Sequence, residues 1–362
     1  MNKKQAFLFL LTTLLFAPLA LTGQASDAWF AFTEGEEDSA LVGYKDAAGQ
    51  VRIAPRFSPY MTSARKFDDI IAVAEEKENG EWNSYYLTKS GRRVGHGDMY
   101  VFDSGFDCES EGFIRFTQDG KTGMFDAAGN IAIPAEYNAL SRAMNGMVHG
   151  LRNARKKYHG EHYAWEGGEG VLLTTNNKIL IENFDFFDSD LDLYSLEISN
   201  QPGASPLRKN FLGVDGKNYA FVSFEREFLA WLDAALPEDF GKSDLLRVTH
   251  EKIAELTGEE AMQGFSKAQF VDAQHARIRA RLALRKEEGN FISKECSIPE
   301  LLEEAYFDNC RESKVWRYPV MCVVIAHHTA DDDDYQDFFI FMRTGQGYEL
   351  IDMRIVDQRT ED

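Results

Sequence analysis

The amino-acid sequence predicts a β-rich repeat module of stacked β-hairpin units with a period of about 40 residues, followed by an α+β domain. The first half carries an imperfect internal repeat with shared glycines at positions 49, 91 and 129. In the second half, the apolar spacing changes to the three- and four-residue steps of a helix. Three short runs rich in apolar residues then close the chain. They predict an antiparallel sheet against which the helices pack.

The N-terminal segment, residues 1–25, has the order of a cleaved secretory signal peptide. Two lysines provide a positive start, Ala6 to Leu21 is an uncharged apolar run, and small residues follow at a cleavage point. A membrane anchor is the alternative, but a spanning helix needs roughly 20 apolar residues, and this run is shorter and contains Pro18. We therefore expect a periplasmic or secreted protein with no membrane span in the mature chain.

Residues 43–53 and 123–133 are the clearest copies of the repeat, with six identical positions out of eleven. In each copy Asp-Ala-Ala-Gly separates two short apolar runs. This is a hairpin signal, because glycine supplies a left-handed turn conformation and aspartate bonds its own backbone. Weaker copies occur at 86–94 and at 171–181, where Asn177 takes the place of glycine. One unit cannot bury its apolar face alone, so neighbouring units must stack. We expect this domain to span residues 26–198.

The repeat resembles the bacterial WG (tryptophan-glycine) repeat over roughly residues 35–190. Residues 111–126 follow the family pattern most closely. The departure lies in the Trp-Gly pair itself, since Thr122-Gly123 keeps only the glycine and Trp82-Asn83 keeps only the tryptophan. The resemblance implies β-rich modules that bind partners. It therefore implies a non-catalytic interaction or scaffold module with protein partners in the cell envelope.

Exposed aromatic side chains of the repeats are the candidates for that interaction surface. They are Tyr60, Trp82, Tyr85 and Tyr100. Large aromatic residues of a repeat also serve as core, so each of the four has a structural alternative.

Residues 199–217 are rich in Gly, Pro and Ser and predict a linker to the α+β domain at residues 218–362. Apolar spacing predicts a helix from Phe221 to Leu232 that Pro237 stops, and more helical stretches through 245–256 and 268–286. A capping box with proline in the first turn predicts another helix over 297–307. Strands are expected at 318–326, 337–343 and 348–356.

This order of helices and strands is analogous to the cystatin-like and NTF2-like cones, which hold a pocket between helix and sheet. The alternative function is therefore an enzyme or a small-ligand-binding protein with a pocket in the C-terminal domain. Its candidate lining residues are Trp231, Trp316, His327 and Tyr348.

The charge of the chain argues against nucleic acid as a partner. The sequence has 39 basic and 59 acidic residues, a net charge of -20, and loss of the two signal-peptide lysines would bring it near -22. Such a surface repels phosphate backbones, and no basic stripe with interleaved aromatics is present.

The sequence offers no catalytic constellation. It lacks a nucleophile elbow, a phosphate-binding loop and a dinucleotide fingerprint, so no catalytic residue, cofactor or metal is assigned. His327 and His328 precede Asp331–Asp334, which are suitable metal donors. Consecutive aspartates cannot all face one ion, so we interpret this cluster as a solvated loop. A polar loop between the third and fourth repeats is likewise the interpretation of His149, His159 and His162.

Export permits the four cysteines to form disulfides. Cys296 and Cys310 flank the helix predicted over 297–307, and they can pair if the chain turns back after Phe307. We expect this Cys296–Cys310 bridge, with Cys322 as the alternative partner of either. Cys108 lies in the other domain and is expected to be a buried free thiol.

Overall fold

The computed structural model describes residues 28–36, 40–102, 105–160, 162–258, 262–294, 297–327 and 335–356. The predicted signal peptide therefore lies outside the described residues. Within these ranges, no helix combines the length and the apolar character needed to cross a bilayer.

The protein is β-rich, with many antiparallel sheets and a few helices toward the C-terminus. Strands of the first sheet are β1 (Trp29–Glu34), β2 (Leu41–Lys45), β3 (Val51–Phe57), β4 (Lys66–Phe67), β5 (Ile70–Glu76), β6 (Trp82–Thr88) and β7 (Arg93–Val94), in the order β4-β1-β2-β3-β5-β6-β7. β3 and β5 pair only at Phe57 and Glu75, so the sheet folds into two halves that enclose a core.

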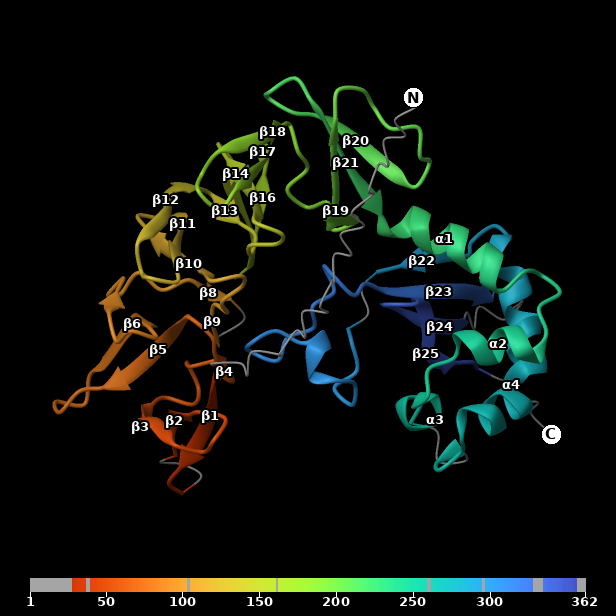
Figure 1. The fold of residues 1–362 in the computed structure, drawn as a ribbon, viewed down its shortest axis with the longest axis horizontal. Helices are drawn as coiled ribbons and strands as arrows, with labels where there is room; N and C mark the ends of the chain where they lie inside the picture. Colours follow the sequence, from red (N-terminus) through yellow and green to blue (C-terminus); the bar gives the residue numbers. More distant parts are fainter. Residues whose placement is uncertain are drawn as a thin grey trace, which may run out of the picture.

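Smaller antiparallel sheets follow along the chain. Their strands are β8 (Val101–Phe102) with β9 (Gly105–Phe106); β10 (Phe113–Gln118), β11 (Lys121–Asp126) and β12 (Ile131–Tyr137); β13 (Ala139–Leu140), β14 (Met147–Arg152), β17 (Glu169–Thr174) and β18 (Ile179–Glu182); and the hairpin β15 (Arg155–His159) with β16 (His162–Glu166). A further sheet contains β19 (Leu191–Ser199), β20 (Arg208–Leu212) and β21 (Asn218–Ser223). Figure 1 shows the sheets following one another along an arc, from β1–β3 through β10–β12 to β19–β21.

Alternate residues of a strand point to opposite faces of its sheet, so one strand can contribute side chains to the cores on both sides. In β11, Phe125 enters a core shared with β5 and β6, whereas the adjacent Met124 enters a core shared with β14 and β17. In β17, Val171 belongs to that second core, and the adjacent Leu172 belongs to a third core shared with β19 and β21. The sheet of β10–β12 and the sheet of β13, β14, β17 and β18 therefore each share one core with the sheet before it and another with the sheet after it.

Four turns of this series have the same local geometry. Gly49, Gly91, Gly129 and Asn177 all have positive φ, between 63° and 87°. At each turn their amide N–H donates to the carbonyl three residues earlier, with N···O distances of 2.9 to 3.0 Å. Asn177 adopts the left-handed conformation that glycine adopts in the other three turns. Asparagine takes up this conformation more readily than most residues do.

The glycine of the Trp-Gly position has a steric explanation. A Cβ on Gly43 would lie 2.6 Å from the carbonyl oxygen of Ile53, and a Cβ on Gly123 would lie 2.7 Å from that of Ile133. At both places the register to the next strand is irregular, which brings that strand's backbone against the glycine. Only glycine fits such a close approach.

Residues 199–217, predicted as a linker, contain strand β20 (Arg208–Leu212). β20 pairs with β21 (Asn218–Ser223), which also pairs with β19 (Leu191–Ser199). The linker prediction is therefore wrong for this segment, because its turn-forming residues lie in loops between paired strands. The turn at Gly216 also has positive φ and repeats the same N–H to carbonyl bond, to Gly213.

The C-terminal region combines helices with a four-stranded antiparallel sheet. The helices are α1 (Phe224–Ala235), α2 (Lys242–Val248), α3 (Ile253–Leu256) and α4 (Lys267–Leu282), with the 3₁₀ turn η2 (Ala283–Lys286), and the sheet contains β22 (Phe291–Ser293), β23 (Val320–His327), β24 (Tyr335–Thr344) and β25 (Gly347–Arg354). Side chains from α1, α2 and α4 share one core with those of the sheet. The three closing strands are confirmed, with ends shifted by one or two residues.

The first predicted helix begins later than expected, because Phe221 lies in β21 and Ser223 caps α1 by accepting from the N–H of Arg226. The helix predicted over 297–307 is wrong. This stretch contains only the 3₁₀ turn η3 (Glu304–Tyr306). We call residues 297–318 the clasp, because Figure 1 shows this segment reaching from the C-terminal sheet back toward β4 and β9.

Candidate functional site

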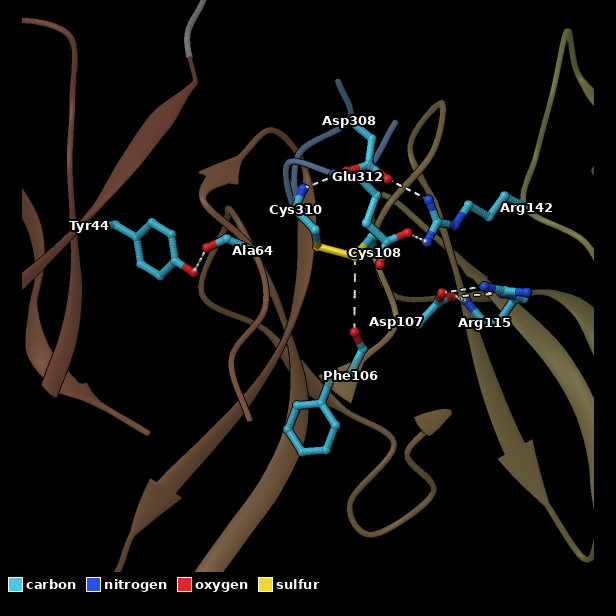
Figure 2. Close-up of a disulfide and its surroundings, with 10 residues drawn as sticks. All are labelled: Tyr44, Ala64, Phe106, Asp107, Cys108, Arg115, Arg142, Asp308, Cys310 and Glu312. Carbon is cyan, nitrogen blue, oxygen red and sulfur yellow. Dashed lines mark hydrogen bonds and ion pairs between the residues drawn. A yellow bond between two sulfur atoms is a disulfide. The ribbon is translucent and has the colours of Figure 1, made fainter. Parts of the chain in front are cut away.

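A disulfide between Cys108 and Cys310 ties the clasp to the series of sheets (Figure 2). The predicted Cys296–Cys310 pair and the predicted free thiol of Cys108 are therefore both wrong. Cys296 lies outside the described residues, and Cys322 is buried in β23. Without a helix over 297–307, the clasp is extended enough to bring Cys310 to the other half of the protein. The sulfurs of this pair and a carboxylate oxygen of Asp308 lie close together, but a disulfide offers no thiolate to a metal.

Hydrogen bonds and ion pairs hold the clasp on both sides of the disulfide. The carbonyl oxygen of Asn309 accepts from the amides of Arg65 and Lys66, at 2.7 and 3.0 Å. Arg142 forms ion pairs with Asp308 and Glu312, as Figure 2 shows. Arg65 and Lys66 lie at the start of β4, and Arg142 lies in the loop between β13 and β14, so the clasp links separate sheets of the series.

Glu109, next to the disulfide, is a buried carboxyl group with 7% of its surface exposed. Its oxygens accept from the backbone amides of Asp69, Ile70 and Gly112, at 2.9 to 3.2 Å. Burial raises the pKa of Glu109 from 4.5 to about 7, because desolvation outweighs the amide hydrogen bonds.

This pKa predicts a pH-dependent contribution to stability. The folded protein holds the Glu109 proton more tightly than the unfolded chain does, so the contribution is full below pH 4.5 and is lost as the pH rises through 7. Relative to a Glu109→Gln variant, the wild-type free energy of unfolding should fall by about 3 kcal/mol between pH 4 and pH 8. Urea unfolding across this range measures the difference. The control is Glu238→Gln at an exposed position, whose free energy of unfolding should differ little from that of the wild type at any pH in this range. A difference between wild type and Glu109→Gln that does not vary with pH would contradict the prediction.

The hairpin of β15 and β16 carries an exposed group of aromatic and basic side chains. Tyr158 and Tyr163 are 65% and 47% exposed, and their ring centroids lie 5.9 Å apart across the two strands. Trp165 packs edge-on to Tyr163, and the Lys156 ammonium lies 4.0 Å from the centre of the Tyr163 ring. Figure 1 places the hairpin beside the β13–β18 sheet.

A polar hollow of about 450 Å³ separates this hairpin from the sheet of β10 and β11. Lys156, Tyr163 and Trp165 line one side, and Tyr100 and Asp98 line the other. The prediction of a polar loop around His159 and His162 missed this hairpin. The signal in the sequence was a glycine, Gly160, between two runs that contain tyrosine, because glycine favours a hairpin turn. In the structure Gly160 has a positive φ of 68°.

The aromatic residues predicted for the interaction surface have different surroundings. Tyr60 and Trp82 are 77% and 51% exposed and so remain available to a partner. Tyr85 is fully buried in the first core and cannot contact one. Tyr100 is half-buried at the hollow described above, with the Arg115 guanidinium 4.2 Å from its ring centre.

The residues predicted to line a C-terminal pocket lie in three separate surroundings. Trp231 and Tyr348 pack against each other in the helix–sheet core, with ring centroids 5.4 Å apart. Trp316 lies in the clasp under Arg142. His327 ends β23, where its Nε2 atom is 2.7 Å from a carboxylate oxygen of Asp337. His328 and Asp331–Asp334 lie outside the described residues.

Comparison of the chain with protein-family models, with curated proteins and with solved structures found no match.

Proposed function

We propose that this chain is a non-catalytic exported protein of the cell envelope, in which WG-like repeats form a scaffold that binds a partner protein. The sequence of the N-terminal segment, with its charged start, apolar run and small-residue exit, supports export. The Cys108–Cys310 disulfide agrees with an oxidising compartment, where such bonds persist.

The recurring turns support a repeat architecture. Gly49, Gly91, Gly129, Asn177 and Gly216 all have positive φ and the same turn hydrogen bond. They recur at intervals of about 40 residues, with a longer step before Asn177, as expected for stacked repeat units. The shared cores between successive sheets support stacking of these units. Such stacking makes an extended binding surface. In this proposal the repeats continue through β21, beyond the boundary at residue 198.

The observation that carries a binding role is the exposed aromatic and basic hairpin of β15 and β16. Protein interfaces are enriched in tyrosine, tryptophan and arginine, and such aromatic anchors supply much of the binding energy. Beside the exposed tyrosines, Arg155, Lys156 and Lys157 give this acidic chain a locally basic segment. Glu166 pairs with Arg155 and Lys157, which leaves Lys156 on the rings. The patch suits a partner surface that combines apolar and acidic groups.

Site-specific photo-crosslinking in the expressing cell tests this role. A photoreactive phenylalanine at Tyr158 or Tyr163 should give one discrete protein adduct, and Lys156→Glu in the same chain should reduce its yield several-fold, because charge complementarity would be lost. The matched control is Leu212, which is 75% exposed on β20 and should give no such adduct. Equal adducts at Leu212, or none at either tyrosine, would count against the proposal.

A further inference from the structure

The polar hollow of about 450 Å³ between the β15–β16 hairpin and the sheet of β10 and β11 has the size of a small-molecule site. Such sites measure roughly 300–1,000 Å³. The hairpin contributes Lys156, Tyr163 and Trp165 to one wall, and the opposite wall includes Asp98 and Tyr100. Aromatic rings and polar groups therefore face the same space.

Two rings of the hairpin form an apolar corner of the hollow. The rings of Tyr163 and Trp165 stand nearly perpendicular, at 79°, with their centroids 5.4 Å apart. Tyr163 is 47% exposed and Trp165 is half-buried, so ring surface remains accessible from the hollow. This surface can pack against the C–H groups of a ligand.

A tight turn places hydrogen-bond acceptors on the opposite rim. Asp119 and Gly120 join β10 to β11, and both have positive φ, 52° and 74°, as in the two-residue turns of hairpins. Asp98, Gln118 and Asp119 line the hollow, and their side chains make no hydrogen bond or ion pair with the described part of the chain. Their carboxylate and amide groups are therefore open to a ligand.

The charges around the hollow disfavour an ionic ligand of either sign. The carboxylates of Asp98 and Asp119 repel an anion, in a chain whose net charge is already -20. The ammonium of Lys156 lies 4.0 Å from the centre of the Tyr163 ring and 5.5 Å from that of Trp165. It already holds the position that a ligand cation would take over these rings. A wholly apolar ligand would bury the carboxylates without hydrogen bonds, which is costly.

A sugar has the properties that these walls require. Each sugar hydroxyl both donates and accepts, so the carboxylates can accept from it and the Lys156 ammonium can donate to it. The sugar ring also presents C–H groups to the aromatic corner. We infer that the hollow binds a neutral saccharide of one or two units, held between the corner of Tyr163 and Trp165 and the carboxylates of Asp98 and Asp119. This site shares Tyr163 with the proposed partner-binding hairpin but goes beyond that proposal.

Saturation-transfer NMR on the full oxidised chain tests the inference with the neutral disaccharides maltose, cellobiose, lactose and N,N′-diacetylchitobiose. At least one of them should bind at millimolar concentration. Its uronic acid form, in which a carboxylate replaces one hydroxymethyl group, should bind about tenfold more weakly, because Asp98 and Asp119 repel it. Absence of binding by all of these sugars, or equal binding of the uronic acid form, would overturn the inference.

A pair of tryptophan variants localises the binding to the hollow. Trp165→Ala removes a half-buried ring from a surface hairpin, so the chain should fold, and sugar binding should weaken about tenfold through loss of the ring contact. The matched control is Trp82→Ala, at a position 51% exposed on β6 and away from the hollow, and it should bind the sugar as the wild type does. Unchanged binding by a folded Trp165→Ala variant, or an equal loss in Trp82→Ala, would contradict the assignment.

An Asp119→Asn variant tests the polar rim. Asn-Gly favours the same two-residue turn, so the hairpin is kept, while the charge-assisted hydrogen bond to the sugar is lost. Sugar binding should weaken several-fold, and unchanged binding would contradict a role for this carboxylate. The photo-adduct expected at Tyr158, which does not line the hollow, is measured without added sugar, so the two proposals can fail separately.

Discussion

Replacing Cys108 and Cys310 together with serine is expected to lower the free energy of unfolding by about 5 kcal/mol. The two cysteines are 202 residues apart in sequence. In the chain-entropy model, the stabilisation by a disulfide grows with the logarithm of the loop it closes, and this is a long loop. Denaturant unfolding of the wild type and of the double variant, both oxidised, measures the difference.

Reduction of the wild type provides the control for that comparison. A reducing agent should destabilise the wild-type chain by a similar amount and should leave the double-serine variant unchanged. The pairing is contradicted if peptide mapping links Cys310 to Cys296, or if reduction leaves the stability of the wild type unaltered.

Replacing Phe125 with alanine is expected to cost about 3–5 kcal/mol, as for other large buried aromatics. Phe125 is 6% exposed and lies in the core that two neighbouring sheets share. Its ring stacks on Phe116 at 4.2 Å and packs edge-on to Tyr86 of the preceding sheet at 5.2 Å. The loss should therefore combine the transfer free energy of the ring with the cavity left between the sheets.

Ile131 is the matched control because it pairs with Phe125 across β11 and β12 but is 58% exposed. Ile131→Ala should change the free energy of unfolding by no more than about 0.5 kcal/mol. Comparable losses for the two variants would mean that Phe125 is not in a shared core.

Local features of the fold could be predicted from the sequence because they depend on residues close together in the chain. The turns at Gly49 and Gly129 follow from glycine's access to positive φ and from the preceding aspartate, which accepts from the amides two and four residues later. The three closing strands follow from short runs rich in β-branched and aromatic residues.

Long-range features could not be predicted in the same way. The Cys108–Cys310 pair depends on how the clasp folds back across 202 residues, which spacing does not encode. The helix predicted over 297–307 had good capping signals, but its residues instead contribute to a core with β23 to β25. Tertiary packing overrides such local preferences.

The exposure of single side chains on the predicted interaction surface could not be predicted from the sequence either. Trp82 and Tyr85 lie on one strand, yet Trp82 is half exposed and Tyr85 is fully buried. Strand alternation alone does not decide which face meets a neighbouring sheet. The hairpin of β15 and β16 was missed because its basic residues resemble a loop, whereas cross-strand pairing brings Tyr158 and Tyr163 together.

Native-state hydrogen exchange of the Phe125→Ala variant tests most directly whether successive sheets stack through shared apolar cores. If they do, the variant should lose protection in β5 and β6 as well as in β10 and β11, because both sheets border the same core. Loss confined to β10–β12, with wild-type protection retained in β5 and β6, would contradict the stacked scaffold.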